Sequence, residues 1–161
     1  MLVLHQFPIS HYCEKIRWAL AFKKLDYEVN NLLPGPHMKT TRKLASDTAV
    51  PILVHDGRII QNSSDILSYL DATFPQHGLT PPEQDLRDEA LEWERYLDKE
   101  IGIHIRRYFY HTLLQYPSVL IPIFSYHGPW YGPLMYRLIF PALRKRMRDF
   151  MNINANTAVA S

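Results

Sequence analysis

Ser10-His11-Tyr12-Cys13-Glu14-Lys15-Ile16-Arg17 is the stretch of this sequence on which the fold depends. It follows Leu2 to Gln6, an apolar run that predicts a buried strand, and it opens a segment from about Tyr12 to Lys24 that has helical spacing. The stretch would place a hydroxyl and a thiol at the start of a helix, where free backbone N–H groups and the helix dipole favour an anion or a thiolate. The sequence therefore predicts sulfur chemistry here, without saying whose sulfur it is.

The residues that follow continue an alternation of strands and helices. The first helix is expected to bury Ile16, Ala19, Leu20 and Phe22. Asp56-Gly57 is a strong hairpin signal. Further strands are predicted at Tyr27 to Leu33, Pro51 to His55 and Arg58 to Ile60, and further helices at Lys39 to Ala45 and from Ser63 or Ser64 to about Thr73. The order βαβαββα predicts an α/β domain over residues 1–74, with a mixed sheet and helices on both faces.

The character of the sequence changes after Phe74. Residues 75–84 are rich in proline and predict a linker, and residues 85–161 predict a short all-α domain. A long amphipathic helix is expected to run to about Leu114, and a second one from Leu134 to Met151. Prolines at positions 117, 122, 129 and 133 predict an irregular stretch between them. Asn154 to Ser161 resembles the first turns of a helix that stops before it can pack, so we expect a truncated chain.

Composition excludes several classes of function. The net charge of +2 gives no argument for a nucleic-acid partner, and a single cysteine excludes an internal disulfide and a Cys-based zinc cluster. The longest apolar run, Val119 to Phe124, is too short to span a bilayer, and no signal peptide is visible. We therefore expect a cytoplasmic protein with no metal and no membrane span.

Three motifs resemble the glutathione transferase superfamily, in which a thioredoxin-like domain precedes an all-helical one. The opening stretch is similar to the active-site segment of its serine- and cysteine-type classes. Val50-Pro51-Ile52-Leu53 is similar to the Val-Pro-x-Leu that holds the family's cis-proline, and Asn62 to Leu70 is similar to its (Glu/Gln)-Ser-x-x-Ile-x-x-Tyr-Leu. The three motifs occur in the family's order and on the predicted elements.

The resemblance implies a role for each of several residues. Ser10 would hydrogen-bond the glutathione thiol, although a plain helix cap needs no chemistry. Val50 and Pro51 would present backbone groups to the cysteinyl part, or simply begin a strand. Asn62 and Ser63 would hold the γ-glutamyl carboxylate at a helix N-terminus, a role compatible with capping.

Other positions leave alternatives open. Cys13 matches the second cysteine of a Cys-x-x-Cys pair whose first position is Ser10, so it is either catalytic or a small buried residue. His37 and Lys39 would hold the glycyl carboxylate, or are simply solvated. Ala45 to Ala49 departs from the family pattern, and Asn62 replaces a longer Glu or Gln.

In the helical half, the resemblance implies an electrophile site walled by four residues of the long helix: His104, Arg107, Tyr108 and His111. The seven-residue spacing of His104 and His111 spans two turns, and no carboxylate completes a metal site, so a metal pair is not expected. Arg144-Lys145-Arg146-Met147-Arg148 most simply predicts a solvated helix face, and a lipid or nucleic-acid surface is the alternative.

The function that the resemblance implies is a dimeric glutathione transferase that serves detoxification. Bound glutathione would be the cosubstrate, and its thiolate would attack a hydrophobic electrophile with help from Ser10 and the first helix. Two alternatives remain open: a non-catalytic binding or scaffold module of transferase-like fold, and a glutathione-dependent thiol oxidoreductase that uses Cys13.

Overall fold

The computed structural model describes residues 1–154, 156 and 157. Its contacts divide the chain into two compact units, Met1–Arg95 and Tyr96–Ser161. Each unit has its own buried residues.

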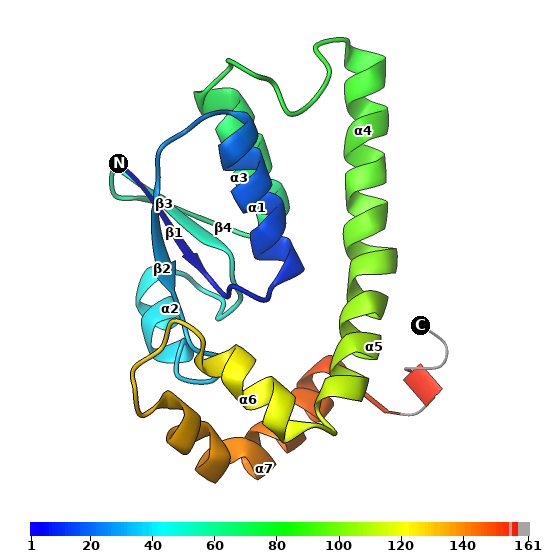
Figure 1. Ribbon diagram of the computed structural model, residues 1–161. Helices are drawn as coiled ribbons and strands as arrows, with labels where there is room; N and C mark the ends of the chain where they lie inside the picture. The colour runs from blue at the N-terminus through cyan, green and yellow to red at the C-terminus, as the bar shows by residue number, and fades with distance from the viewer. Residues whose placement is uncertain (155, 158–161) are drawn as a thin grey trace. The chain divides into compact units, whose positions relative to one another are not determined.

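The first unit is built on a four-stranded sheet (Figure 1). Its strands are β1 (Leu2–Gln6), β2 (Glu28–Asn31), β3 (Ile52–His55) and β4 (Arg58–Gln61), in the spatial order β2-β1-β3-β4. β1 runs parallel to β2 and antiparallel to β3, and β3 runs antiparallel to β4. Together with the helices, this confirms the predicted βαβαββα order and its mixed sheet.

Three helices accompany the sheet: α1 (His11–Phe22), α2 (Met38–Leu44) and α3 (Ser63–Thr73). α1 and α3 pack side by side on one face, and α2 lies on the other side of the strands (Figure 1). Eight buried apolar residues form the core between the sheet and helices α1 and α3: Leu2, Leu4, Ile16, Ala19, Leu20, Leu53, Ile66 and Leu70.

One expected core residue of α1 is exposed. The sequence predicts that Phe22 is buried with Ile16 and Leu20, but 59% of its surface is exposed. Phe22 follows Trp18 by four residues, which places both side chains on the same helix face. Trp18 is 70% exposed, so this apolar face points away from the core.

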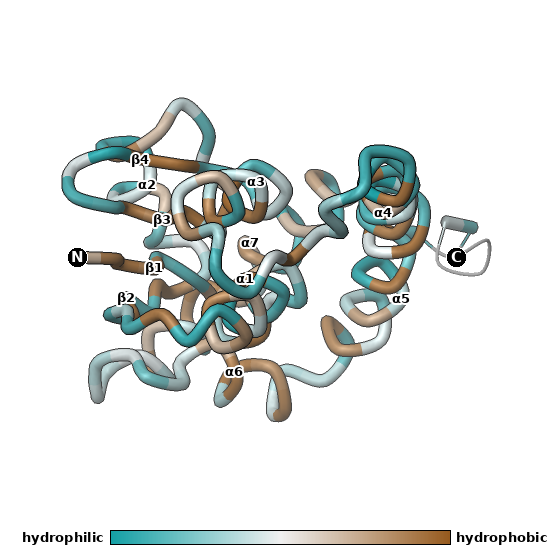
Figure 2. Tube along the Cα trace, turned by 90° about the horizontal axis from the view of Figure 1, so that it is seen from above, coloured by the Kyte–Doolittle hydropathy of each residue, from teal (hydrophilic) through white to brown (hydrophobic). Residues whose placement is uncertain are grey.

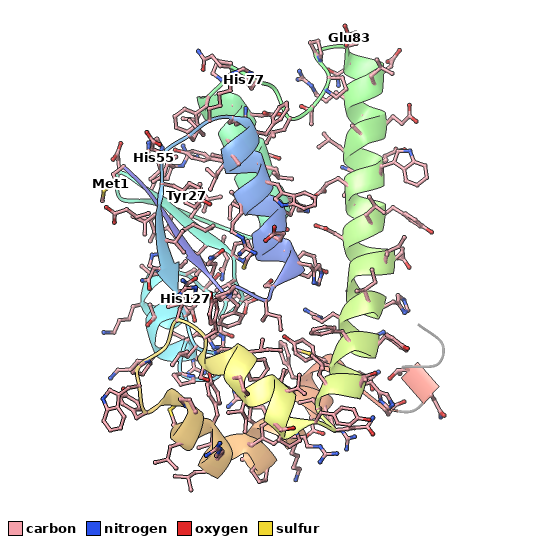
Figure 3. The ribbon with its side chains drawn as sticks, in the orientation of Figure 1. Met1, Tyr27, His55, His77, Glu83 and His127 are labelled. Atoms are coloured by element: carbon pink, nitrogen blue, oxygen red, sulfur yellow. The ribbon has the colours of Figure 1, made fainter. Side chains whose placement is uncertain are left out.

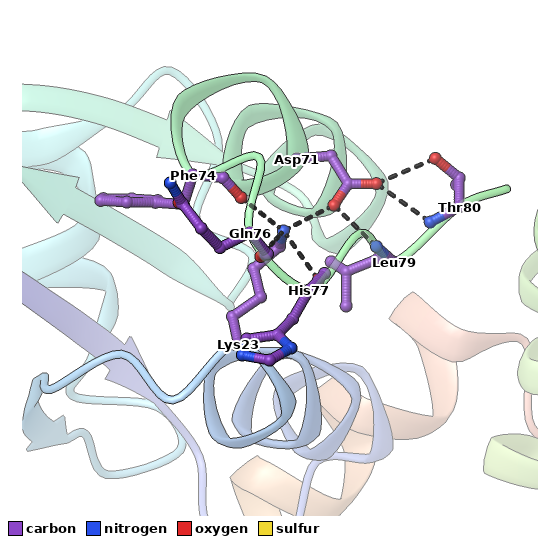
Figure 4. A network of polar contacts seen from close by, with 7 residues as sticks. All are labelled: Lys23, Asp71, Phe74, Gln76, His77, Leu79 and Thr80. Carbon is purple, nitrogen blue, oxygen red and sulfur yellow. Dashed lines mark hydrogen bonds and ion pairs between the residues drawn. The ribbon is translucent and has the colours of Figure 1, made fainter. Parts of the chain in front are cut away.

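A buried ion pair joins the ends of α1 and α3 to the chain that follows them (Figure 4). Lys23 has no exposed side-chain surface, and its Nζ lies 2.7 Å from Asp71 Oδ1. The same Nζ donates to the carbonyl oxygens of Phe74 (2.7 Å), Gln76 (3.4 Å) and His77 (3.2 Å). Asp71 also accepts hydrogen bonds from Leu79 N (2.8 Å), Thr80 N (3.1 Å) and Thr80 Oγ1 (2.9 Å).

These bonds set the ionisation of Asp71. Burial alone would raise the pKa of its carboxyl. The bonds from Lys23, Leu79 and Thr80, with the charge of Lys23, outweigh that cost and hold the pKa below its usual value. Segment 74–80 is thereby fixed to the first unit.

A long helical segment then runs through α4 (Gln84–Tyr96), the π-helix η1 (Leu97–Gly102) and α5 (Ile103–Leu113). Its extent agrees with the prediction, but the six residues of η1 interrupt the regular α spacing. No residue of α4 is buried, and Figure 2 shows its tube mostly in hydrophilic teal, whereas β3 carries hydrophobic brown. Leu86 and Trp93 are accordingly 52% and 57% exposed.

The second unit also contains α6 (Pro117–Ser125) and α7 (Gly132–Met151). The prediction of an irregular stretch is wrong for residues 117–125. Pro117 occupies the first turn of α6, where its missing N–H costs nothing, and Pro122 is accommodated inside the helix. Large apolar side chains form the core of this unit, including Leu114, Leu120, Phe124, Tyr136 and Phe140.

The predicted terminal helix start at Asn154 to Ser161 falls partly outside the described residues. Over the described part of the chain, every helix is too short or too polar to cross a bilayer.

Candidate functional site

Three chain segments that are far apart in sequence meet at one end of the sheet, where the strands begin or finish. The register pairs His5 with Ile52, and Ile52 with Gln61. Because these pairs are antiparallel, the end of β1, the start of β3 and the end of β4 lie at the same end of the sheet. The segments that contain Ser10, Val50-Pro51 and Asn62-Ser63 leave the sheet there. Met1 and His55 lie at the opposite end (Figure 3).

Ser10 is the N-cap of α1. Its backbone is extended, and its Oγ accepts a hydrogen bond from Cys13 N at 3.4 Å. Its own N–H donates to Phe7 O at 3.1 Å, which closes the turn between β1 and the helix. A serine hydroxyl has one donor and two acceptor sites, so this capping bond leaves the O–H proton able to serve a second partner.

Cys13 lies one turn inside α1 and has no exposed surface. Burial raises the pKa of its thiol. The hydrogen bonds from Ser10 and Phe7 and the charge of Arg17 act in the opposite direction but do not reverse the shift. A buried thiol with a raised pKa is a poor nucleophile. This environment is that of a small residue lining the helix.

The Val50–Pro51 peptide bond is cis, as the motif predicts. Asn62 N donates to Pro51 O at 3.3 Å, so the cis bond lies beside the start of α3. Asn62 caps α3, and its Oδ1 accepts from Ser64 N at 3.3 Å. Ser63 is buried at the first position of that helix.

The two candidates from the α2 region differ in their surroundings. His37 Nδ1 accepts a hydrogen bond from Gly35 N at 3.0 Å, and its ring meets the edge of Phe7 at 4.7 Å between centroids. This contact brings the start of α2 to the turn that precedes Ser10. Lys39 is exposed on α2.

The four candidates of the helical half all lie on α5, in the second unit. Tyr108 is 63% exposed. Arg107 Nε donates to Met151 O at 3.1 Å, at the end of α7. His111 Nδ1 is buried without a hydrogen-bond partner among the described residues, and His104 is half-buried.

A hollow of about 530 Å³ adjoins Ser10 in the first unit. Its walls mix apolar and charged side chains from the β1–α1 turn and α1: Pro8, Ile9, Ser10, His11, Glu14, Lys15, Arg17 and Trp18. This mixture suits a polar ligand with an apolar part.

Two supporting groups were not predicted. Arg17 donates hydrogen bonds to Gln6 Oε1 and, at 3.1 Å, to Pro8 O, and it forms an ion pair with Glu14. These contacts stabilise the turn that precedes Ser10. The Glu14–Arg17 spacing is visible in the sequence as an i,i+3 pair, but the contacts with the turn are not.

Glu94 is the second unpredicted group. From α4, its Oε1 pairs with Lys15 of α1 at 2.5 Å and accepts a hydrogen bond from Ser64 Oγ of α3 at 2.8 Å. No sequence signal links a residue of α4 to these two helices. Within the described residues, no three His, Cys, Asp or Glu side chains gather to hold a metal ion.

The family model that matches this chain covers residues of the first unit only. Residues 4–78 match the model of the glutathione S-transferase N-terminal domain. Glutathione S-transferase 1 of Dianthus caryophyllus is 36% identical over 94 residues, which are 56% of this chain and 42% of that protein. Maleylacetoacetate isomerase of Dictyostelium discoideum is 38% identical over 84 residues, 49% of this chain and 38% of that protein. The matches thus span less than half the length of these relatives.

Solved structures agree. A glutathione S-transferase from Methylobacterium radiotolerans, in complex with glutathione sulfonate, has a TM-score of 0.61 at 27% identity, covering 68% of this chain and 52% of that one. The beta-etherase LigF from Sphingobium sp. strain SYK-6 shares the fold, with a TM-score of 0.66 at 20% identity over 98% of this chain and 68% of that one. Over residues 4–78, the resemblance to the glutathione transferase superfamily is confirmed.

Proposed function

We propose that this chain, whose residues 4–78 match the model of the glutathione S-transferase N-terminal domain, binds glutathione at this end of the sheet and activates its thiol for attack on a hydrophobic electrophile. The observation that carries the proposal is that three features meet at that end of the sheet. They are the Ser10 cap of α1, the cis Val50–Pro51 bond and the capped start of α3.

Ser10 would act on the thiol of glutathione. Its Oγ already accepts from Cys13 N, so its O–H can donate to a thiolate at the same time. The positive end of α1 adds to the stabilisation of that negative charge. Both effects lower the pKa of the bound thiol, so more of it is ionised near neutral pH.

The remaining candidate residues would hold the rest of the tripeptide. The backbone of Val50 would pair with the cysteinyl part, as an added strand pairs with a sheet edge. Asn62 and Ser63, at the start of α3, would receive the γ-glutamyl carboxylate. His37 and Lys39 would hold the glycyl carboxylate.

The electrophile and the partner are finer parts of the same proposal. The hollow beside Ser10 offers apolar walls for an acceptor. The electrophile-site role proposed for His104, Arg107, Tyr108 and His111 of α5 rests on the family resemblance alone. In the reaction, a sulfur–carbon bond forms and the bond to the leaving group breaks, and the thiol proton is released to water. We further propose that the protein acts in the cytoplasm, in detoxification, as a homodimer.

The test combines binding and turnover. The chain is passed over immobilised glutathione and assayed with glutathione and 1-chloro-2,4-dinitrobenzene. Ser10→Ala should lower the turnover about 100-fold, the usual cost of one donor to a developing charge, while the column still retains the protein. The matched control is Cys13→Ser, which should retain most of the activity. If the wild-type chain does not bind glutathione, the proposal is wrong.

A binding module without catalysis is the second candidate. Ala49 stands where the family often has a polar side chain, and its carbonyl is already engaged by Gln61 Nε2 at 2.9 Å. Retention on glutathione without turnover of any electrophile would favour this candidate. The oxidoreductase alternative requires Cys13 as nucleophile, and the burial of its thiol argues against that role.

A further inference from the structure

Helix α7 carries two apolar faces. One of them is buried: Tyr136, Phe140 and Met147 lie in the core of the second unit, where the ring of Tyr136 meets that of Phe124 at 5.8 Å between centroids. A helix that packs against one core needs only one such face, and its opposite side is normally polar. The apolar residues on the opposite side of α7 therefore need an explanation.

The second apolar face runs along the exposed side of α7. Four of its residues recur at helical spacing and therefore share one side of the helix: Leu134, Leu138, Pro141 and Lys145. All four are exposed, and the exposed fractions of Leu134 and Leu138 are 58% and 76%. Trp130, just before the helix begins, is 91% exposed. Single exposed leucines are ordinary, but two on one helix face with a tryptophan at its start indicate an interaction surface.

The charged residues around this face are nearly all basic. Between Ile101 and Ser161 there are seven Lys or Arg residues and one acidic residue, Asp149. Arg137 and Lys145 are exposed on α7, and neither forms an ion pair among the residues that the structure describes. A partner that complements this surface is therefore negatively charged.

The basic run at residues 144–148 is divided between the core and the solvent. Lys145 and Arg146 are exposed, as the sequence predicts for a solvated helix face. Arg144 and Arg148 are half-buried, and the Nε atom of each is buried without a hydrogen-bond partner among the described residues. The prediction of a solvated face is therefore wrong for these two arginines.

We propose that the exposed face of α7 binds the surface of a membrane that contains anionic lipids. Trp130, Leu134 and Leu138 would enter the headgroup region, where apolar side chains and the amphipathic tryptophan ring are stable. Arg137 and Lys145 would pair with lipid phosphate groups, which attract basic side chains near the surface. A nucleic acid would use the two charges but leave the leucines in water, so a lipid surface accounts for both parts of the face.

Vesicle co-sedimentation of the whole chain tests the proposal. The probes are vesicles of phosphatidylcholine alone and vesicles of phosphatidylcholine and phosphatidylglycerol in equal parts. The chain should sediment with the anionic vesicles far more than with the neutral ones, and salt should weaken the binding because it screens exposed charges. Ser10→Ala should bind as the wild type does, so failure of the glutathione proposal leaves this one intact. If the chain does not bind anionic vesicles at low salt, the proposal is wrong.

Two pairs of variants test the basic residues. Arg137→Gln with Lys145→Gln should weaken binding about 25-fold, since each basic residue near an anionic surface contributes roughly fivefold. The control, Arg42→Gln with Lys43→Gln, removes the same charge from exposed positions of α2 and should change binding less than about 2-fold. Equal losses in the two pairs would mean general ionic attraction and would overturn the proposal.

The apolar residues are tested separately. Leu134→Ser with Leu138→Ser should weaken binding at least about 10-fold, whereas the control, Leu86→Ser with Leu97→Ser, changes exposed leucines outside α7 and should have little effect. Binding should shift tryptophan emission to the blue, and Trp130→Phe should remove that shift. If Leu134→Ser with Leu138→Ser instead turns a dimer into a monomer and leaves vesicle binding unchanged, the face is a contact between two copies and the proposal is wrong.

Discussion

The two units bury cations in opposite ways. In the first unit, Lys23 is fully buried, and its ammonium meets the Asp71 carboxylate and three carbonyl oxygens. In the second unit, Arg106, Arg144 and Arg148 bury Nε atoms without a partner among the described residues. Since a buried polar group is costly unless it is paired, the first unit satisfies the ammonium of Lys23, whereas the second leaves these Nε atoms unsatisfied.

A second contrast is how the candidate residues of the two units are held in place. Ser10, Pro51 and Asn62 are fixed by backbone hydrogen bonds and by the sheet register. The four candidates on α5 share one helix, and Arg107 among them bonds to Met151 O at 3.1 Å. A site held by several elements keeps its geometry when one side chain is changed, so mutations can distinguish chemistry from folding in the first unit.

The largest effect is expected for Lys23→Met. The change keeps the apolar stem but leaves Asp71 and three carbonyl oxygens without their donor. Breaking a buried pair in this way costs about 3–5 kcal/mol of unfolding free energy. Urea denaturation of the first unit measures it. The neighbouring exposed residue provides the control, since Lys24→Met should cost less than about 0.5 kcal/mol. Equal losses in the two variants would refute the view that the pairing of Lys23 stabilises this unit.

Asp71 should make the unfolding free energy depend on pH in the acid range. Its folded pKa lies below its ordinary value of 3.8, so its contribution is complete above that value and is lost as the pH falls through the folded pKa. Asp71→Asn should cost about 1–3 kcal/mol at neutral pH and should lack this part of the acid dependence. Urea midpoints between neutral pH and pH 2 measure both effects. Parallel pH curves for the two proteins would contradict the assignment.

The sequence predicted the first unit better than the second because its signals are local. Strand periodicity, the Asp56-Gly57 hairpin and the Val50-Pro51 motif each act within a few residues, and all three led to the correct elements. The failures were of two kinds: one came from an interaction between distant residues, and two came from local patterns whose outcome was misjudged. Nothing in the sequence indicated that Glu94 pairs with Lys15, that Phe22 faces away from the core, or that a helix forms despite Pro122.

A smaller effect is expected where α4 meets α1 and α3. Glu94→Gln can keep the hydrogen bond with Ser64 but loses the charge that pairs with Lys15. Because this pair is only partly buried, the loss should be about 1 kcal/mol. Urea denaturation measures it against Glu92→Gln, an exposed control on the same helix. If the two variants are equally stable, the contact of α4 does not contribute to the stability of the first unit.

The smallest effect is expected for Arg148→Met, which repeats the Lys23→Met change in the second unit. Because Arg148 Nε has no hydrogen-bond partner among the described residues, its removal breaks no hydrogen bond seen there, and the unfolding free energy should change by no more than about 0.5 kcal/mol. Urea denaturation of the wild type and the variant measures the change. A large loss would mean that Arg148 is already paired within the protein, and the contrast between the two units would fail at that residue.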